Sequence, residues 1–248
     1  MEYAGIGLVV GIIMGLTGAG GALISIPLFI NIVNLGLKEA TILSLVAVVF
    51  GTSINMWGQM KKVHLNITIP LALAGIISNY LSLPLKKIVP DVIVALLLTL
   101  IALYSLWGVW SGGKNEKKLI KENNTVIKAL VAGTVLGLLT TLTGLGGGVV
   151  LIPLLIKVFG KSYEEALPTS LGTVLVISLS SFLMQFSGVK DIASINEIIY
   201  LGIGSFLSFF LLKIGIKKLS KETIGITRQI TFSLVAVYSV TSVIIKAL

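Results

Sequence analysis

Long apolar runs separated by short charged breaks dominate this chain of 248 residues. Most runs contain about 20 residues, which is the length of α-helix needed to cross the hydrocarbon core of a bilayer. The pattern therefore predicts an all-α polytopic membrane protein. The runs cover, approximately, 4–34, 40–60, 66–84, 92–111, 126–159, 166–187, 195–213 and 224–245.

Composition excludes several other classes of protein. Hydrophobic residues make up 55% of the chain and charged residues 12%, whereas a soluble domain carries about 25% charged residues. The net charge of +9 comes from lysines clustered between the apolar runs. Since no basic stripe with interleaved aromatic residues is found, the expected partner is the lipid bilayer and not nucleic acid. The chain has no cysteine, and no metal or other cofactor is expected.

The chain consists of two homologous halves. An offset of 126 residues superimposes a glycine cluster, a proline, a Glu-Ala pair and a glutamine of the first half on the same residues of the second. Such matches are specific because glycine, proline and glutamine are not interchangeable with aliphatic residues. We therefore divide the chain into a first transmembrane repeat at 1–112, a polar linker at 113–123 and a second transmembrane repeat at 124–248.

The first apolar run of each half is too long for one span. Residues 4–34 as a single helix would reach about 46 Å, whereas the hydrocarbon core is about 30 Å thick. A glycine cluster interrupts each run and a proline follows at the same spacing, which predicts new helices beginning near Ala22 and Gly148. Unwound backbone at membrane depth must be buried in protein or line a cavity.

The placement of basic residues distinguishes two topologies. If every run crosses, eight spans result, with nine basic residues on one face and ten on the other. If each broken run is a re-entrant hairpin, six full spans remain, and fourteen basic residues oppose five: Lys38, Lys86, Lys87, Lys190 and Lys246. The positive-inside rule favours the second topology. Each half is then a glycine-broken re-entrant helix pair followed by three transmembrane helices. An odd number of spans per half makes the halves inverted repeats. The alternative is eight spans, with the two halves in parallel orientation.

The two glycine breaks are the candidate binding site. A helix N-terminus presents unpaired N–H groups and a partial positive charge, so it binds anions without a cationic side chain. The alternative is that the glycines only permit close helix packing. Matched polar residues of neighbouring runs are expected to line the pathway. The predicted substrate-binding residues are Thr17, Gly18, Gly20, Gly21, Thr143, Gly144, Gly146, Gly147, Gly148, Gln59, Gln185, Asn55 and Ser181.

Other chemistry is not expected from the charged residues. No Asp, Glu, Lys or His falls in the middle of an expected span, which excludes a carboxylate proton relay. Glu39 and Glu165 occupy matching positions in the two halves. Each is expected in the first turn of its helix, where a carboxylate caps the N-terminus. His64 is expected at an interface. No nucleophile has a histidine base within reach, so the chain is not expected to be an enzyme.

Two segments carry a resemblance to a known family. GLTGAGGALISIPL at 15–28 and LTGLGGGVVLIPL at 142–154 resemble the signature of the TauE/SafE family of membrane permeases, as does the stretch at 165–170 that opens the following helix. The first half departs from the pattern at Ala22 and at 40–44. The resemblance implies a secondary transporter of sulfite, sulfonates or related sulfur-containing anions in a plasma membrane.

The resemblance leaves open the transported anion, its direction, a coupling ion and a homo-oligomeric state. The alternative function is a passive channel for a small anion or neutral solute. A bulky residue in place of Gly20 or Gly146 is expected to abolish transport and to leave membrane insertion intact.

Overall fold

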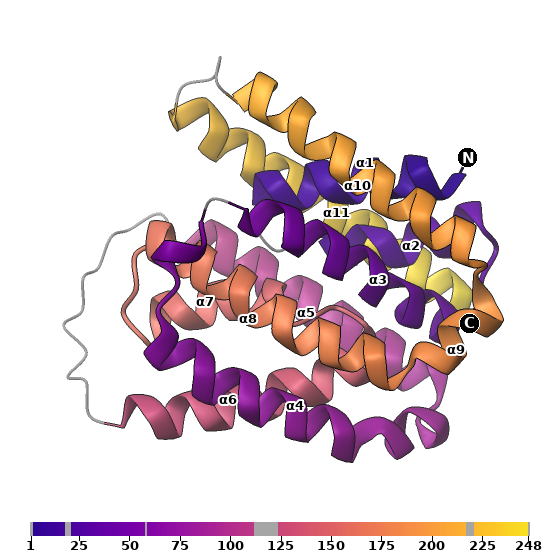
Figure 1. The fold of residues 1–248 in the computed structure, drawn as a ribbon, viewed down its shortest axis with the longest axis horizontal. Helices are drawn as coiled ribbons and strands as arrows, with labels where there is room; N and C mark the ends of the chain where they lie inside the picture. The colour runs from indigo at the N-terminus through magenta and orange to yellow at the C-terminus, as the bar shows by residue number, and fades with distance from the viewer. Residues whose placement is uncertain (1, 18–20, 58, 112–123, 217–220, 248) are drawn as a thin grey trace.

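The computed structural model describes residues 2–17, 21–57, 59–111, 124–216 and 221–247, and every regular element in these ranges is a helix. The expected all-α class is confirmed (Figure 1). The elements are α1 (Glu2–Thr17), α2 (Gly21–Ile32), α3 (Leu37–Met56), η1 (Met60–Lys62), α4 (Leu65–Ile88), α5 (Asp91–Ser111), α6 (Thr125–Thr143), α7 (Gly148–Lys157), α8 (Tyr163–Met184), α9 (Phe186–Ile192), α10 (Ile195–Ile216) and α11 (Lys221–Ala247).

Seven helices of the described ranges are long and apolar enough to cross a membrane: α3, α4, α5, α6, α8, α10 and α11. The sequence predicted six full spans. The additional helix is α6, which we assigned to the second hairpin and which has 19 residues against 16 in α1. The shorter apolar helices are α1, α2 and α7. The short helix α9 was not expected as a separate element.

The second broken run leaves the helix at its glycine cluster, and in the first run α1 ends at Thr17 and α2 begins at Gly21. The second helix of each pair begins at Gly21 and at Gly148, within one residue of the predicted starts. In the first pair, the ring of Tyr3 in α1 lies 6.2 Å from that of Phe29 near the end of α2. The start of α1 therefore lies beside the end of α2, and the two helices form a hairpin. In the second pair, the first turns of α6 and the last turns of α7 line one groove, which places those arms in the same antiparallel relation.

Glycines bring two pairs of helices into close contact. A Cβ on Gly7 or Gly11 of α1 would overlap Leu201 or Ser208 of α10. A Cβ on Gly133 or Gly137 of α6 would overlap the carbonyls of Leu71 and Gly75 in α4. Small residues at four-residue spacing let helix backbones approach in this way. For these four glycines, packing is the role that the structure shows. Since the contacts advance together along both chains, α1 runs parallel to α10, and α4 to α6.

The helices α3 and α8 pack against each other in the interior of the bundle and run antiparallel. Gly172 of α8 lies near Met56 at the end of α3, whereas Gly188, just after α8, lies near Ile42 at its start. Figure 1 shows both chain termini at the same end of the bundle, together with α9. This end also holds the start of α3 and the ends of α4 and α8, so we call it the terminal end. The opposite end, with the start of α8, is called the linker end.

A buried asparagine ties three of the helices together. Asn79 of α4 is fully buried, and its Nδ2 donates to the carbonyl of Ile177 at 2.9 Å and to Ser180 Oγ at 2.8 Å. Its Oδ1 accepts a hydrogen bond from Thr141 Oγ1 at 3.0 Å. These contacts join α4 to α8 and α6. They satisfy an amide that would otherwise be costly to bury.

Candidate functional site

The second glycine break is a short left-handed turn between α6 and α7. Gly144, Gly146 and Gly147 have φ values of +69°, +64° and +74°, a region that residues with a Cβ adopt only at a cost. Gly144 ends α6, and Gly147 is the N-cap of α7. The glycines therefore make it possible for α7 to begin inside the protein. In the first break, Gly18 and Gly20 lie outside the described residues.

Residues of α3 and α8 enclose the second break. Ser44 Oγ donates a hydrogen bond to the Gly144 carbonyl at 2.9 Å. A Cβ added to Gly146 would lie 2.5 Å from Ser178 Oγ and 2.9 Å from Val48 Cγ1. All four residues from Gly144 to Gly147 are buried. The break is therefore closely packed in this conformation.

Two buried hydroxyl groups next to this break have no hydrogen-bond partner among the described residues. They are Thr140 Oγ1 and Ser178 Oγ, and both side chains are fully buried. Ser178 faces Gly146, and Thr140 Oγ1 lies 3.6 Å from where a Cβ of Gly147 would stand. The amides of Gly148 and Val149 lie in the first turn of α7, where helical N–H groups have no intrahelical acceptor. Hydroxyl groups of α6 and α8 thus adjoin the glycine turn from which α7 begins.

The threonines that precede the breaks bond to their own helices. Thr17 Oγ1 donates to the Ile13 carbonyl at 2.8 Å, and Thr143 Oγ1 to the Leu139 carbonyl at 2.6 Å. Thr143 Oγ1 also lies 3.4 Å from the Leu145 amide nitrogen, from which it accepts a hydrogen bond. Tyr163 at the start of α8 donates to the Thr17 carbonyl at 3.3 Å. In this conformation, therefore, neither threonine directs its hydroxyl proton to a ligand.

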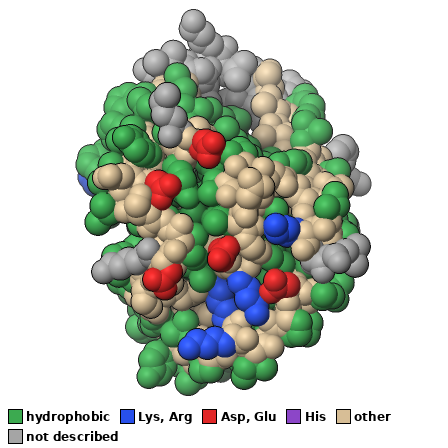
Figure 2. All heavy atoms as spheres, turned by 90° about the vertical axis from the view of Figure 1, so that its right-hand side faces the viewer, with side chains coloured by type: hydrophobic (Ala, Val, Ile, Leu, Met, Phe, Trp, Pro, Cys, Tyr) green, Lys and Arg blue, Asp and Glu red, His purple; other side chains and the backbone are tan. Residues whose placement is uncertain are grey.

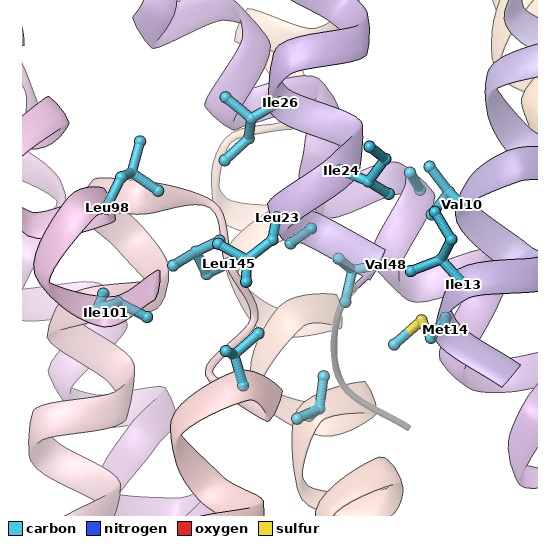
Figure 3. Close-up of a cluster of buried hydrophobic side chains, with 14 of the residues drawn as sticks. Val10, Ile13, Met14, Leu23, Ile24, Ile26, Val48, Leu98, Ile101 and Leu145 are labelled. Carbon is cyan, nitrogen blue, oxygen red and sulfur yellow. The ribbon is translucent and has the colours of Figure 1, made fainter. Parts of the chain in front are cut away.

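The second break and the helices that flank the first break reach the central part of α3. Gly146 lies against Val48, and Met14 lies close to both Gly21 and Gly51. Positions 48 and 51 are less than one helical turn apart. Figure 3 shows that apolar side chains, including Leu23, Val48 and Leu145, occupy the space around this centre. The second break and the start of α2 thus contact neighbouring turns of α3, and apolar side chains fill the space beside them.

The predicted polar residues of α3 and α8 separate into two groups. Near the end of α3, the half-exposed Gln59 donates to the Asn55 carbonyl at 3.1 Å, and Asn55 donates to the Gly51 carbonyl at 2.8 Å. At the end of α8, the buried Gln185 donates to Ser181 Oγ at 2.9 Å. Because α3 and α8 are antiparallel, the structure places the two glutamines at opposite ends of the molecule and does not bring them together.

Lys86 is a buried lysine that sequence reasoning missed. The helix α4 continues to Ile88, beyond the end at 84 that we expected, so Lys86 belongs to its last turn. Its side chain is 8% exposed, and its Nζ donates to Gln185 Oε1 at 2.8 Å. The expectation concerns the middle of the spans and is not contradicted, because Lys86 lies in the last turn of α4; the burial of this lysine is the unexpected finding. The lysine pair at 86–87 is the available signal, since it follows directly on the apolar run at 66–84.

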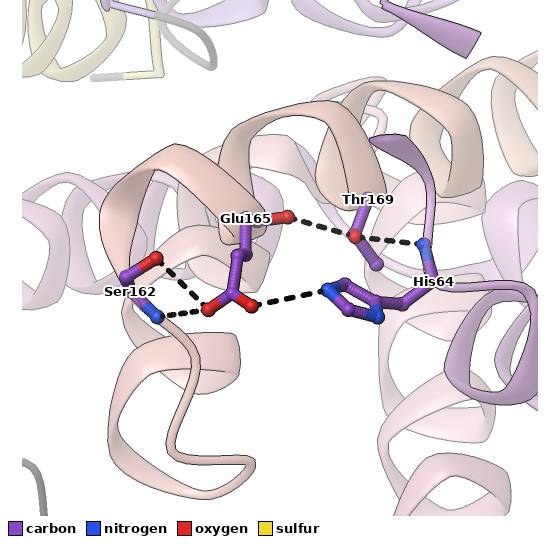
Figure 4. Close-up of polar contacts among 4 residues, drawn as sticks. All are labelled: His64, Ser162, Glu165 and Thr169. Atoms are coloured by element: carbon purple, nitrogen blue, oxygen red, sulfur yellow. Dashed lines mark hydrogen bonds and ion pairs between the residues drawn. The ribbon is translucent and has the colours of Figure 1, made fainter. Parts of the chain in front are cut away.

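Both predicted capping carboxylates are confirmed. Glu39 accepts a hydrogen bond from the Gly36 amide at 2.8 Å, and Glu165 accepts one from the Ser162 amide at 2.9 Å. Figure 4 shows that the second oxygen of Glu165 faces His64, whose Nε2 is 3.5 Å away. The His64 amide donates to Thr169 Oγ1 at 3.2 Å. These contacts join the start of α4 to the first turns of α8 at the linker end.

Comparison with known proteins identifies one family. A family model described as "Sulfite exporter TauE/SafE" matches residues 3–241. No curated protein and no solved structure matches the chain.

Proposed function

The chain belongs to the TauE/SafE sulfite exporter family, and from that premise we propose that it binds a small sulfur oxyanion at the second glycine break. Members of this family are membrane transporters and not enzymes. The match and the seven candidate spans make the chain a multi-pass membrane protein. We propose in addition that the chain is a secondary transporter in the plasma membrane, and we propose its substrate class and its binding site.

The observation that carries the proposal is the pair of unpartnered hydroxyls beside the start of α7. A buried hydroxyl without a partner costs free energy, so such groups are uncommon in folded proteins. Here Ser178 lies against Gly146 and Thr140 lies beside Gly147, the residue that precedes the first turn of α7. Sulfite and sulfonate headgroups carry several acceptor oxygens and negative charge, which match hydroxyl and N–H donors. The helix terminus adds about half a positive elementary charge.

The packing around the break favours a transporter over a passive channel. A Cβ on Gly146 already meets Ser178 and Val48, so an oxyanion fits only when α3 and α8 move apart. Leu145 and Leu23 close the space toward the first break. Opening on one side at a time is what alternating access requires. An open pore would need a continuous polar path past these side chains.

The contacts also support an inverted relation between the halves. Under the 126-residue offset, α3 corresponds to α8, α1 to α6, and α4 to α10. The corresponding helices α3 and α8 are antiparallel, and the parallel contact of α1 with α10 has its counterpart in that of α6 with α4. These are the relations expected of inverted repeats. The positive-inside rule then assigns the linker end, where Lys61, Lys62 and Lys161 lie, to the cytoplasm.

Removal of the unpartnered hydroxyls tests the proposed site. Ser178→Ala and Thr140→Val take away no hydrogen bond formed in the described structure, so thermal unfolding in detergent should shift by less than about 3 °C. If both hydroxyls bind the anion, KM for ³⁵S-sulfite in proteoliposomes should rise about tenfold for each variant.

The matched controls are Ser53→Ala and Thr134→Val, which are exposed and bond to their own helices. We expect wild-type KM from both. Wild-type KM in the Ser178 and Thr140 variants would contradict the proposed site. An absence of sulfur-oxyanion transport by the wild-type protein would contradict the function itself.

A further inference from the structure

A cavity at the terminal end of the molecule contains the buried lysine described above. Its volume is about 720 Å³, and it lies where the start of α3 meets the ends of α4 and α8. Its lining includes Lys38, Lys86, Lys87, Gln185 and Ser187, but no Asp or Glu. Figure 2 views this end of the molecule and shows lysine side chains gathered beside one another in its lower part, with acidic side chains around them.

Lys86 is buried without a negative partner among the described residues. Its Nζ donates to the neutral amide oxygen of Gln185, and no described carboxylate lies within 4.0 Å of it. The carboxylate at the rim, Asp91, instead lies 3.6 Å from Lys38 Nζ. A buried charge is stable only when it is paired or well solvated. The cavity therefore presents a lysine amine that an anion arriving from outside these residues would stabilise in its charged form.

Most of the basic residues assigned to the terminal end lie together in one place. Of the five basic residues that the sequence assigns to this end, Lys38, Lys86 and Lys87 line the one cavity. A lysine that serves only as a topology signal needs to reach water, as Lys87 does, whereas Lys86 points inward and is 8% exposed. Positive charge focused in a cavity raises the local concentration of anions.

A line of polar side chains leads from this cavity to the second break. Gln185 donates to Ser181 Oγ at 2.9 Å, and Ser178 lies one turn further along α8, beside Gly146. The three residues lie on one face of α8, since they are spaced by three and four positions. Seven residues of helix correspond to about 10 Å. The cavity and the break are therefore close enough to serve one pathway.

We propose that this cavity is the extracytoplasmic mouth of the pathway, where Lys86 provides the counter-charge that captures the transported oxyanion. This inference rests on the proposed function and deepens it. Gln185 holds the ammonium group in place, and Ser181 fixes the amide. The oxyanion replaces Gln185 as the partner of Lys86 and then passes along α8 toward Ser178. The chain thus uses a cationic side chain for capture and main-chain amides for the inner site.

Two variants with opposite effects on the local charge test this inference. Lys86→Met removes the cation and keeps the length of the side chain. Gln185→Glu keeps the shape but places a carboxylate on Lys86, where it competes with the anion while folding is preserved by an ion pair. For each variant, KM for ³⁵S-sulfite and the sulfite concentration that half-maximally raises the melting temperature should increase about tenfold or more. Lys246→Met, an exposed lysine at the same end, is the matched control and should behave as wild type.

The readouts distinguish the possible failures. Unchanged KM and unchanged sulfite stabilisation in both variants would overturn the role of Lys86 while transport by the wild type stands. If sulfite stabilises the wild type and not the variants but no transport is seen, the mouth is supported and the proposed function fails. The measurements are made in vesicles of phosphatidylcholine alone and with phosphatidylglycerol. An effect of the variants that is confined to phosphatidylglycerol vesicles would show that the cavity holds a lipid phosphate, and would overturn the proposal.

Discussion

Substitution of Gly146 by alanine tests the packing of the second break with a single methyl group. The backbone at this residue has φ = +64°, which costs about 1–2 kcal/mol for a residue with a Cβ. The added carbon would stand 2.5 Å from Ser178 Oγ, 2.9 Å from Val48 Cγ1 and 3.2 Å from Val174 Cγ1. Overpacking of this kind costs a further amount of about 1–3 kcal/mol. We expect Gly146→Ala to lower the free energy of unfolding by about 2–5 kcal/mol.

The assay combines thermal unfolding in detergent with ³⁵S-sulfite transport in proteoliposomes. We expect the melting temperature of Gly146→Ala to fall by at least about 4 °C, and transport to fall further than the folded fraction does, because the methyl group occupies the proposed site. The control is Gly5→Ala in α1, where a Cβ meets nothing within 4 Å. It should keep wild-type transport and gain slightly in helix propensity. Wild-type stability and transport in Gly146→Ala would refute the described geometry of the break.

Two further predictions concern the packing around the site. Asn79→Leu removes three hydrogen bonds that join α4 to α8 and α6, so we expect the free energy of unfolding to fall by about 2–4 kcal/mol; an unchanged melting temperature in detergent would contradict this. Gly137→Leu places a side chain where the α4 backbone passes, so we expect separation of α4 from α6 and loss of the monodisperse peak in size-exclusion chromatography. A monodisperse, stable Gly137→Leu protein would show that these helices are not in close contact.

The sequence was sufficient for the helical class and for the places where helices restart. Glycine clusters followed by proline are strong local signals, and α2 and α7 begin where they indicate. Capping by Glu39 and Glu165 was equally predictable, because the carboxylate acts on an amide three residues away. The length of α6 was harder to predict, because a helix that spans the membrane is only a few apolar residues longer than the arm of a hairpin.

The candidate site was only partly predictable, because its decisive features depend on contacts between distant segments. The chain has many serines and threonines, and most of those described return a hydrogen bond to their own helix. Only the packed structure shows that four buried hydroxyls among the described residues do not, those of Thr68, Thr140, Ser170 and Ser178, and that two of the four lie beside the second break. Lys86 was missed because hydropathy does not show which way the last turn of a helix faces. Gln59 and Gln185 match in sequence, yet the antiparallel arrangement of α3 and α8 separates them.

The most direct measurement of the central claim is the position of a bound oxyanion in an experimental structure. Selenite is a heavier analogue of sulfite, and in crystals of the protein it can be located by its anomalous scattering. The account predicts a peak within hydrogen-bond distance of Ser178 Oγ and of the Gly148 and Val149 amides, with α3 and α8 further apart than in Figure 1. Selenite bound elsewhere in a transport-competent protein, with the second break still closed around Gly146, would contradict it.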